Sequence, residues 1–219
     1  MSEGLGALSV AYRDLAQFAA WLDEPASWRP TGCAGWAVRD LVFHLLGDAQ
    51  RALVAFATPA SRPADRDAVT YWIDAPGQAD PESRNLRATR TMASAWRLTG
   101  LTVAYRETAR AVVTMAGRVA PHALIETQGH VLRADDLVTT LAVEAAVHHL
   151  DLVVDLDRPG PGPEPLALVR RTLDRLLGHP VPVNWDDETW ARAGTGRRRL
   201  SPAEQEMQGD DAARFPLRQ

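Results

Sequence analysis

The sequence predicts an all-α protein, a four-helix bundle followed by a small C-terminal appendage. Apolar residues recur at helical spacing in four long stretches. One of these stretches, from Asp136 to Asp155, is apolar on nearly every side, as in a buried helix. After it comes the breaker LDRPGPGPEP, which predicts a boundary between a bundle of residues 1–156 and a segment of residues 157–219 that packs on it.

The first two helices are predicted over residues 5–22 and 38–57, each with an apolar seam. The segment between them, DEPASWRPTGCAGW, is rich in Pro, Gly and Trp, and we expect an ordered loop that Trp36 holds to the bundle. Cys33 is the only cysteine, so a disulfide framework and a thiolate metal cluster are excluded. A small buried filler is favoured for Cys33 over a reactive thiol.

A long connection, TPASRPADRDAVTYWIDAPGQADP, follows the second helix. Connections of this length are uncommon in compact domains and are often functional. Its residues Tyr71 and Trp72 could cover a pocket or simply anchor the segment. The third helix is then predicted over residues 82–117, with Gly100 as a kink.

Two signals precede the fourth helix. The segment APHALIETQGHVLRADD interrupts the helical pattern and predicts a small hairpin around Gly129. Asp135 or Asp136 is the predicted N-cap of the helix that follows.

The predicted appendage begins with a short fifth helix from Pro165 to Gly178. Beyond it, VPVNW and ETWARAG predict short strands, and Ser201 starts a capped turn. The arginines 197, 198 and 199 between them could bind a substrate carboxylate or form a solvated basic cluster.

The fourth helix carries a polar stripe, because Glu144, His148, Asp151 and Asp155 fall within about 60° of one another at 100° per residue. Burying such groups is costly unless they are paired or bind a metal. Glu144 and His148, four residues apart, can direct a carboxylate oxygen and an imidazole nitrogen at one ion, and His44 is the best candidate for a third ligand. Alternatively, His148 bonds Asp151 or a carbonyl while Glu144 pairs with an arginine, and the residues alone leave both alternatives open.

Two aspartates, Asp40 and Asp48, lie one turn on either side of His44. They could orient a ligating imidazole or form a solvated acidic face.

Composition argues against several other classes of protein. The net charge is −4 and no basic block dominates, so nucleic-acid binding has little electrostatic support. No apolar run approaches the roughly 18 residues of a membrane span, and the N-terminus lacks a signal-peptide pattern. We therefore expect a soluble, cytoplasmic protein without membrane or nucleic-acid partners, and the sequence leaves open whether it forms a homodimer.

Two motifs together carry a family resemblance: GWAVRDLVFHLLGD at residues 35–48 and TTLAVEAAVHHLDLVVDL at residues 139–156. Over about residues 5–156 the chain resembles the DinB-like superfamily, in its mycothiol-dependent maleylpyruvate isomerase branch. In two places it departs from that branch. Ala37 replaces the usual small hydroxyl residue after the Trp, and only about 60 residues follow the linker, where that branch has a sterol-carrier-like second domain.

The resemblance implies a DinB-like four-helix bundle that binds a divalent metal, often zinc, through His44, Glu144 and His148. It also implies mycothiol as a thiol cosubstrate, which coordinates as a thiolate and attacks a small electrophilic substrate in an isomerisation or S-transfer. Asp151 would be either a partner that orients His148 or a proton acceptor. Arg197 and Arg198 are expected to help bind the cosubstrate. The donor set itself also accepts nickel or iron.

Three hypotheses follow. The first is this metal-dependent, thiol-using isomerase or transferase. The second is a non-catalytic metal-binding or small-molecule-binding bundle that mainly forms a dimer. The third is a purely structural bundle in which the polar stripe pairs with itself.

Overall fold

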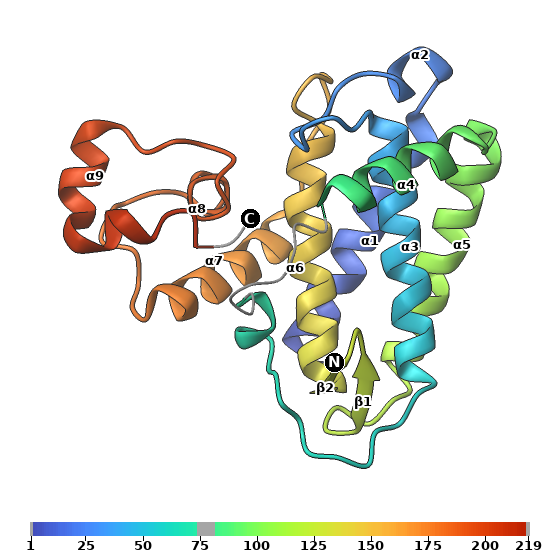
Figure 1. The fold of residues 1–219 in the computed structure, drawn as a ribbon, viewed down its shortest axis with the longest axis horizontal. Helices are drawn as coiled ribbons and strands as arrows, with labels where there is room; N and C mark the ends of the chain where they lie inside the picture. Colours follow the sequence, from blue (N-terminus) through green and yellow to red (C-terminus); the bar gives the residue numbers. More distant parts are fainter. Residues whose placement is uncertain (1, 74–81, 218–219) are drawn as a thin grey trace.

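The computed structural model describes residues 2–73 and 82–217. The all-α prediction is confirmed, with one two-stranded sheet among the described residues. The later helices lie to one side of the bundle (Figure 1). The bundle is formed by four long helices: α1 (Glu3–Trp21), α3 (Val38–Phe56), α5 (Leu98–Ala116) and α6 (Ala134–Leu152).

Helix α6 is covered by several neighbours, which explains its apolar character. It packs against α1, α3 and the appendage helix α7 (Pro163–Leu177). Leu8 of α1 and Leu150 of α6 are fully buried in this packing. Burying one such side chain stabilises the fold by about 1.5–3 kcal/mol. A polar group on α6 therefore needs a specific partner in the folded protein.

The predicted third helix is in fact two helices, α4 (Glu82–Ser94) and α5. The chain turns at residues 95–97, and Gly100 lies inside α5 rather than at a kink. A buried arginine of α3 explains the break. Arg39 Nη2 donates to the carbonyl of Trp96 at 2.7 Å and to that of Ala93 at 3.4 Å. These carbonyls lie at the end of α4, where helical partners run out.

The predicted hairpin around Gly129 is confirmed. Strand β1 (Leu124–Thr127) pairs antiparallel with β2 (His130–Arg133). The two turn residues, Gln128 and Gly129, have φ of 50° and 82°. Positive φ at both positions is typical of the tight turns that match strand twist, and glycine adopts it without strain.

Helix α6 begins directly after the hairpin, and its predicted N-cap is wrong. The cap residue is Arg133, which contributes no side-chain cap, whereas Asp135 and Asp136 lie in the first turn. Negative charge is favourable there because of the helix dipole. Asp136 Oδ1 also accepts a hydrogen bond from the Ala68 amide at 3.0 Å, which fixes the long connection.

The end of α6 also differs from the prediction. The helix stops at Leu152, so Asp155 does not belong to the polar stripe. Asp155 instead pairs with Arg29 of the loop before α3, at 2.6 Å.

The long connection follows the hairpin as far as residue 73. The Ala60 amide donates to the Leu124 carbonyl at 2.9 Å, and the Glu126 amide donates to the Thr58 carbonyl at 3.0 Å. A short 3-10 helix, η1 (Thr70–Trp72), ends this part. The remainder of the predicted connection, residues 74–81, lies outside the described residues.

The described part of the appendage consists of helices joined by loops, with no strand. Helix α7 starts two residues earlier than predicted and ends, as predicted, at Gly178 with a left-handed φ of 98°. No strand is found at VPVNW among the described residues, and ETWARAG forms a helix instead of a strand. The remaining elements are α2 (Glu24–Ser27), which precedes α3, and in the appendage α8 (Asp187–Gly194), α9 (Pro202–Gln208) and η2 (Gly209–Arg214).

Local caps determine α8 and α9. Asp186 caps α8 by accepting from the Thr189 amide at 2.7 Å, and Ser201 caps α9 as predicted. Trp190 of α8 is fully buried, and one apolar core continues from α6 through α7 to α8. The predicted division of the chain after residue 156 stays a prediction. Across the described ranges, no helix combines the length and apolarity that crossing a membrane requires.

Candidate metal centre

The structure brings His44 of α3 together with Glu144 and His148 of α6. Glu144 and His148 share a face because they are one helical turn apart, and α3 packs along that face. His148 Nε2 lies 3.1 Å from Glu144 Oε1, and His44 Nε2 lies 3.9 Å from the same oxygen. The two imidazole rings are nearly perpendicular, with centroids 5.0 Å apart.

This donor set fits a divalent ion. In a tetrahedral site with metal–ligand bonds of about 2.0–2.2 Å, neighbouring ligand atoms lie about 3.3 Å apart. The two measured distances, 3.1 and 3.9 Å, lie on either side of that value. Two imidazole nitrogens and one carboxylate oxygen suit zinc, nickel or iron. The structure thus brings the three predicted ligands together, and their assignment to a metal remains a proposal.

Asp151 contacts His148 on the side of the imidazole ring opposite Glu144. Its Oδ2 lies 3.0 Å from His148 Nδ1, and its side chain is only 1% exposed. Burial by itself raises the pKa of Asp151, but hydrogen bonds from His148 and Arg197 lower it to about 2. An ionised Asp151 keeps a proton on Nδ1, so Nε2 is the nitrogen available to a metal beside Glu144. Of the two predicted roles of Asp151, this geometry favours orientation of His148 over proton acceptance.

The pKa of His148 is raised well above 6.5. Burial opposes this rise, but hydrogen bonds to Asp151, Cys33 and Glu144 outweigh it. A proton and a divalent ion would therefore compete for Nε2 beside Glu144, so metal binding would be favoured by rising pH.

The two aspartates that flank His44 have different roles. Asp40 Oδ2 accepts from the Ala37 amide at 2.9 Å and so stabilises the start of α3, where Ala37 supplies no cap of its own. Asp48 Oδ2 lies 3.2 Å from His44 Nε2, the nitrogen that faces Glu144. Asp48 is thus beside the donor atoms rather than behind the ring. Burial raises the pKa of Asp48, and the charge of Glu144 adds to the rise.

Cys33 differs from the buried filler that the sequence favours. Its Sγ lies 3.2 Å from Asp151 Oδ2 and 3.7 Å from His148 Nδ1, and the residue is partly exposed. Sulfur, imidazole and carboxylate thus form a second group of potential ligand atoms around His148. Nothing in the local sequence TGCAGW signals this contact, because its partners lie more than a hundred residues away.

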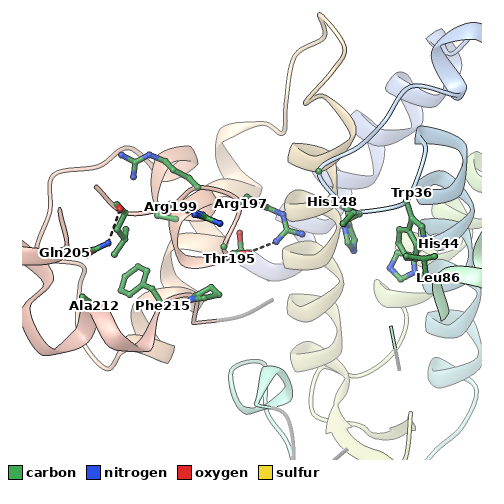
Figure 2. Close-up of a pocket in the computed structure, with 18 residues that line it drawn as sticks. Trp36, His44, Leu86, His148, Thr195, Arg197, Arg199, Gln205, Ala212 and Phe215 are labelled. Carbon is green, nitrogen blue, oxygen red and sulfur yellow. Dashed lines mark hydrogen bonds between the residues drawn. The ribbon is translucent and has the colours of Figure 1, made fainter. Parts of the chain in front are cut away.

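A pocket of about 780 Å³ opens between the bundle and the appendage (Figure 2). On the bundle side Cys33, Trp36, His44 and His148 line it, and on the other side lie residues 193–200 and the segment around Phe215. Trp36 packs its ring on His44, with centroids 5.1 Å apart, so the expectation that it holds the loop to the bundle is met. The centre therefore faces a cavity large enough for a small molecule.

The three consecutive arginines all line this pocket. Arg197 Nε and Nη2 donate to Asp151, and Nη1 donates to the Thr195 carbonyl at 3.0 Å. Arg198 pairs with Glu204 and lies over the Trp185 ring. Arg199 is exposed and lies on the appendage side of the pocket (Figure 2). That Arg197 and Arg198 bind a cosubstrate stays a prediction.

A smaller pocket, of about 250 Å³, adjoins the same centre. His44, Asp48 and Glu144 line one part of it, and Tyr71 and Trp72 of η1 line another. The structure therefore supports both alternatives for these aromatic residues, since they line a pocket and Trp72 also packs on the core. The hydroxyl of Tyr71 also accepts a hydrogen bond from Gln128 at the turn of the hairpin.

His149, the residue after His148, points away from the centre. Its ring packs on Phe18 of α1, with centroids 5.8 Å apart, and it is 3% exposed. Burial lowers the pKa of His149 to about 4.

One protein-family model, described as the mycothiol maleylpyruvate isomerase N-terminal domain, matches residues 8–153. The matched range begins in α1 and ends just after α6, so it includes His44, Glu144 and His148. No curated protein and no solved structure matches the chain.

Proposed function

Because the chain belongs to the mycothiol maleylpyruvate isomerase N-terminal domain family, we propose that it is a metal-dependent enzyme that uses mycothiol or a related low-molecular-weight thiol. The observation that carries this proposal is the convergence of His44, Glu144 and His148 beside a pocket. The reaction is an isomerisation or S-transfer on a small electrophilic substrate.

His44, Glu144 and His148 hold the ion, and we propose zinc. Bound there, a divalent ion lowers the pKa of a thiol and acts as a Lewis acid. Asp151 keeps the proton on His148 Nδ1, so that Nε2 remains a donor. Three protein ligands leave room for an exogenous one, which is the usual pattern of a catalytic zinc site. In an isomerisation the thiolate would add to an activated double bond and be eliminated again after rotation, which regenerates the thiol; in an S-transfer it would displace a leaving group.

The two pockets give each reactant its own space. The larger one ends in the three arginines, whose charge suits a carboxylate. The smaller one reaches the centre past Tyr71 and Trp72. We assign the thiol and the electrophile to these two pockets, with Arg197 and Arg198 contributing positive charge to whichever ligand enters the larger one.

The test begins with metal content. Protein purified without a metal-affinity tag should contain close to one equivalent of metal per chain by elemental mass spectrometry, and His148→Ala should contain none. His149→Leu is the matched control, because that neighbouring histidine points away from the centre. Metal equally abundant in both variants would contradict the assigned ligands.

The second step measures turnover of electrophilic substrates with and without mycothiol, before and after removal of the metal. Turnover should require both components. Bound metal without thiol dependence would instead support the non-catalytic binding protein. Absence of metal even after incubation with zinc would leave a bundle whose polar stripe pairs with itself.

A further inference from the structure

The carboxylate of Asp151 joins three parts of the chain that are far apart in sequence. Arg197, which follows α8, binds it through two nitrogens: Nε donates to Oδ1 at 2.8 Å and Nη2 to Oδ2 at 2.7 Å. The Asp151 side chain is 1% exposed and that of Arg197 is 16% exposed. A paired, two-point contact of this kind is strong and fixes both partners in orientation. Arg197 is therefore fixed to α6, at the border of the larger pocket.

Backbone geometry directs Arg197 toward α6. Gly196, immediately before it, has a φ of 76°, which glycine adopts without strain. The carbonyl of Thr195 accepts a third hydrogen bond from Arg197. Figure 2 shows the arginine reaching from the appendage to the bundle beside His148.

The loop before α3 closes over the same carboxylate. The Gly32 amide donates to the Asp151 carbonyl at 3.0 Å. A Cβ on Gly32 would lie only 2.4 Å from Asp151 Oδ1, so this approach requires glycine. The thiol of Cys33 donates to Oδ2 at 3.2 Å. Asp151 is thus fixed from the appendage and from the loop at once.

The same Oδ2 also contacts the candidate metal centre, because it lies 3.0 Å from His148 Nδ1. A hydrogen bond to the distal nitrogen of a ligating histidine fixes the ring orientation and the tautomer, and losing such partners typically lowers metal affinity about 10- to 100-fold. The contacts form one chain from Arg197 through Asp151 to His148. Any movement of Arg197 changes the position and charge of the group that orients the ligand.

We propose that Arg197 is a positioning residue that couples docking of the appendage to metal affinity at the centre of His44, Glu144 and His148. This inference rests on the proposed metal site. With Arg197 in place, His148 is held ready to ligate, and loss of the contact between Arg197 and Asp151 would weaken that orientation. Coupling between two equilibria is reciprocal. Bound metal must therefore stabilise the docked appendage by the same factor by which docking raises the metal affinity.

The experiment measures zinc affinity by competition with a chelator in the wild type and in Arg197→Gln, Arg197→Lys and Arg199→Gln. We expect Arg197→Gln to bind zinc about 10- to 100-fold more weakly. Arg197→Lys should recover part of the loss, because it restores the charge but not the two-point contact. Arg199→Gln, which changes an exposed arginine of the same pocket, should match the wild type.

Two further readouts separate positioning from a general loss of structure. The visible absorption spectrum of the cobalt-loaded protein should shift in Arg197→Gln, because the coordination of His148 changes. In the wild type, zinc should slow amide hydrogen exchange in residues 187–200 and leave α5 unchanged. This last measurement needs no variant, so it holds even if Arg197→Gln fails to fold.

The outcomes distinguish the two proposals. If the wild type binds no metal, the proposed function fails. If the wild type binds zinc, while Arg197→Gln binds it equally well with an unchanged cobalt spectrum, the positioning role is wrong. Exchange in residues 187–200 that is indifferent to zinc would contradict the coupling directly.

Discussion

Two neighbouring histidines on different faces of helix α6 have pKa values shifted in opposite directions. On one face His148 contacts Glu144, Cys33 and Asp151, and its pKa is raised well above 6.5. On the other face His149 packs on Phe18, and burial lowers its pKa to about 4. Both side chains are buried and both follow the same apolar run.

The difference shows that burial alone does not decide what a histidine does. Anionic partners on the first face stabilise the charged or ligating form, and an apolar neighbour on the second stabilises the neutral form. A rotation of about 100° along the helix separates the two environments. The predictions below test this contrast from the largest expected effect to the smallest.

The largest effect is expected for metal affinity. His148→Ala should lower zinc affinity by about three orders of magnitude, or about 4 kcal/mol, because one of three ligands is lost. His149→Leu should leave the affinity unchanged. Chelator competition at neutral pH measures both. Similar losses in the two variants would remove the distinction between the faces.

The second effect concerns stability and pH. The folded-state pKa of His149, about 4, lies below its ordinary value of 6.5, so the unfolded chain binds more protons between these values. The neutral histidine therefore contributes stability that is fully present above pH 6.5 and is lost as the pH falls through 4. For the metal-free wild type this contribution is about 3 kcal/mol.

Chemical denaturation of the metal-free protein at several pH values measures this slope. In His149→Leu the corresponding part of the pH dependence should disappear. An unchanged slope in that variant would mean that His149 is not the group responsible.

A third prediction tests how closely the loop before α3 packs on the face of α6 that carries His148 and Asp151. Gly32→Ala places a methyl group against the Asp151 carboxylate, 2.4 Å from Oδ1, so the loop must shift. We expect a loss of about 1–3 kcal/mol in the free energy of unfolding. Denaturant titration measures the loss, and stability equal to that of the wild type would show that the loop is free to adjust.

The smallest effect on stability is expected for a substitution that contacts neither face of α6. Gly47 lies inside α3, and a Cβ there would meet no atom within 4 Å. Gly47→Ala should stabilise the protein by about 0.5–1 kcal/mol, because alanine favours a helix over the unfolded chain. The same substitution thus has opposite signs at the two glycines, and destabilisation at both would contradict the contact assigned to Gly32.

What the sequence could reveal was local. Apolar spacing predicts α1 and α3, turn residues predict the hairpin around Gly129, and the four-residue spacing of Glu144 and His148 predicts that they share a face. Short segments remained ambiguous, because ETWARAG is compatible with either a strand or a helix until Asp186 is recognised as a cap.

What the sequence could not reveal depends on contacts between distant residues. Arg39 ends α4 by binding carbonyls more than fifty positions away, and no local signal at residues 95–97 records this. Asp155 looks like part of the polar stripe only if α6 continues, and its pairing with Arg29 becomes visible only in the fold. The contacts of Asp151 with Cys33 and Arg197 likewise bridge long stretches of chain.

His44 borders both the larger and the smaller pocket, and this position has a kinetic consequence. If the thiol and the electrophile occupy these two pockets, as proposed above, neither blocks the other and neither has to bind first. A dead-end analogue of either reactant should then be competitive with that reactant and non-competitive with the other. An analogue that is uncompetitive with one of the reactants would instead indicate an obligatory order of addition.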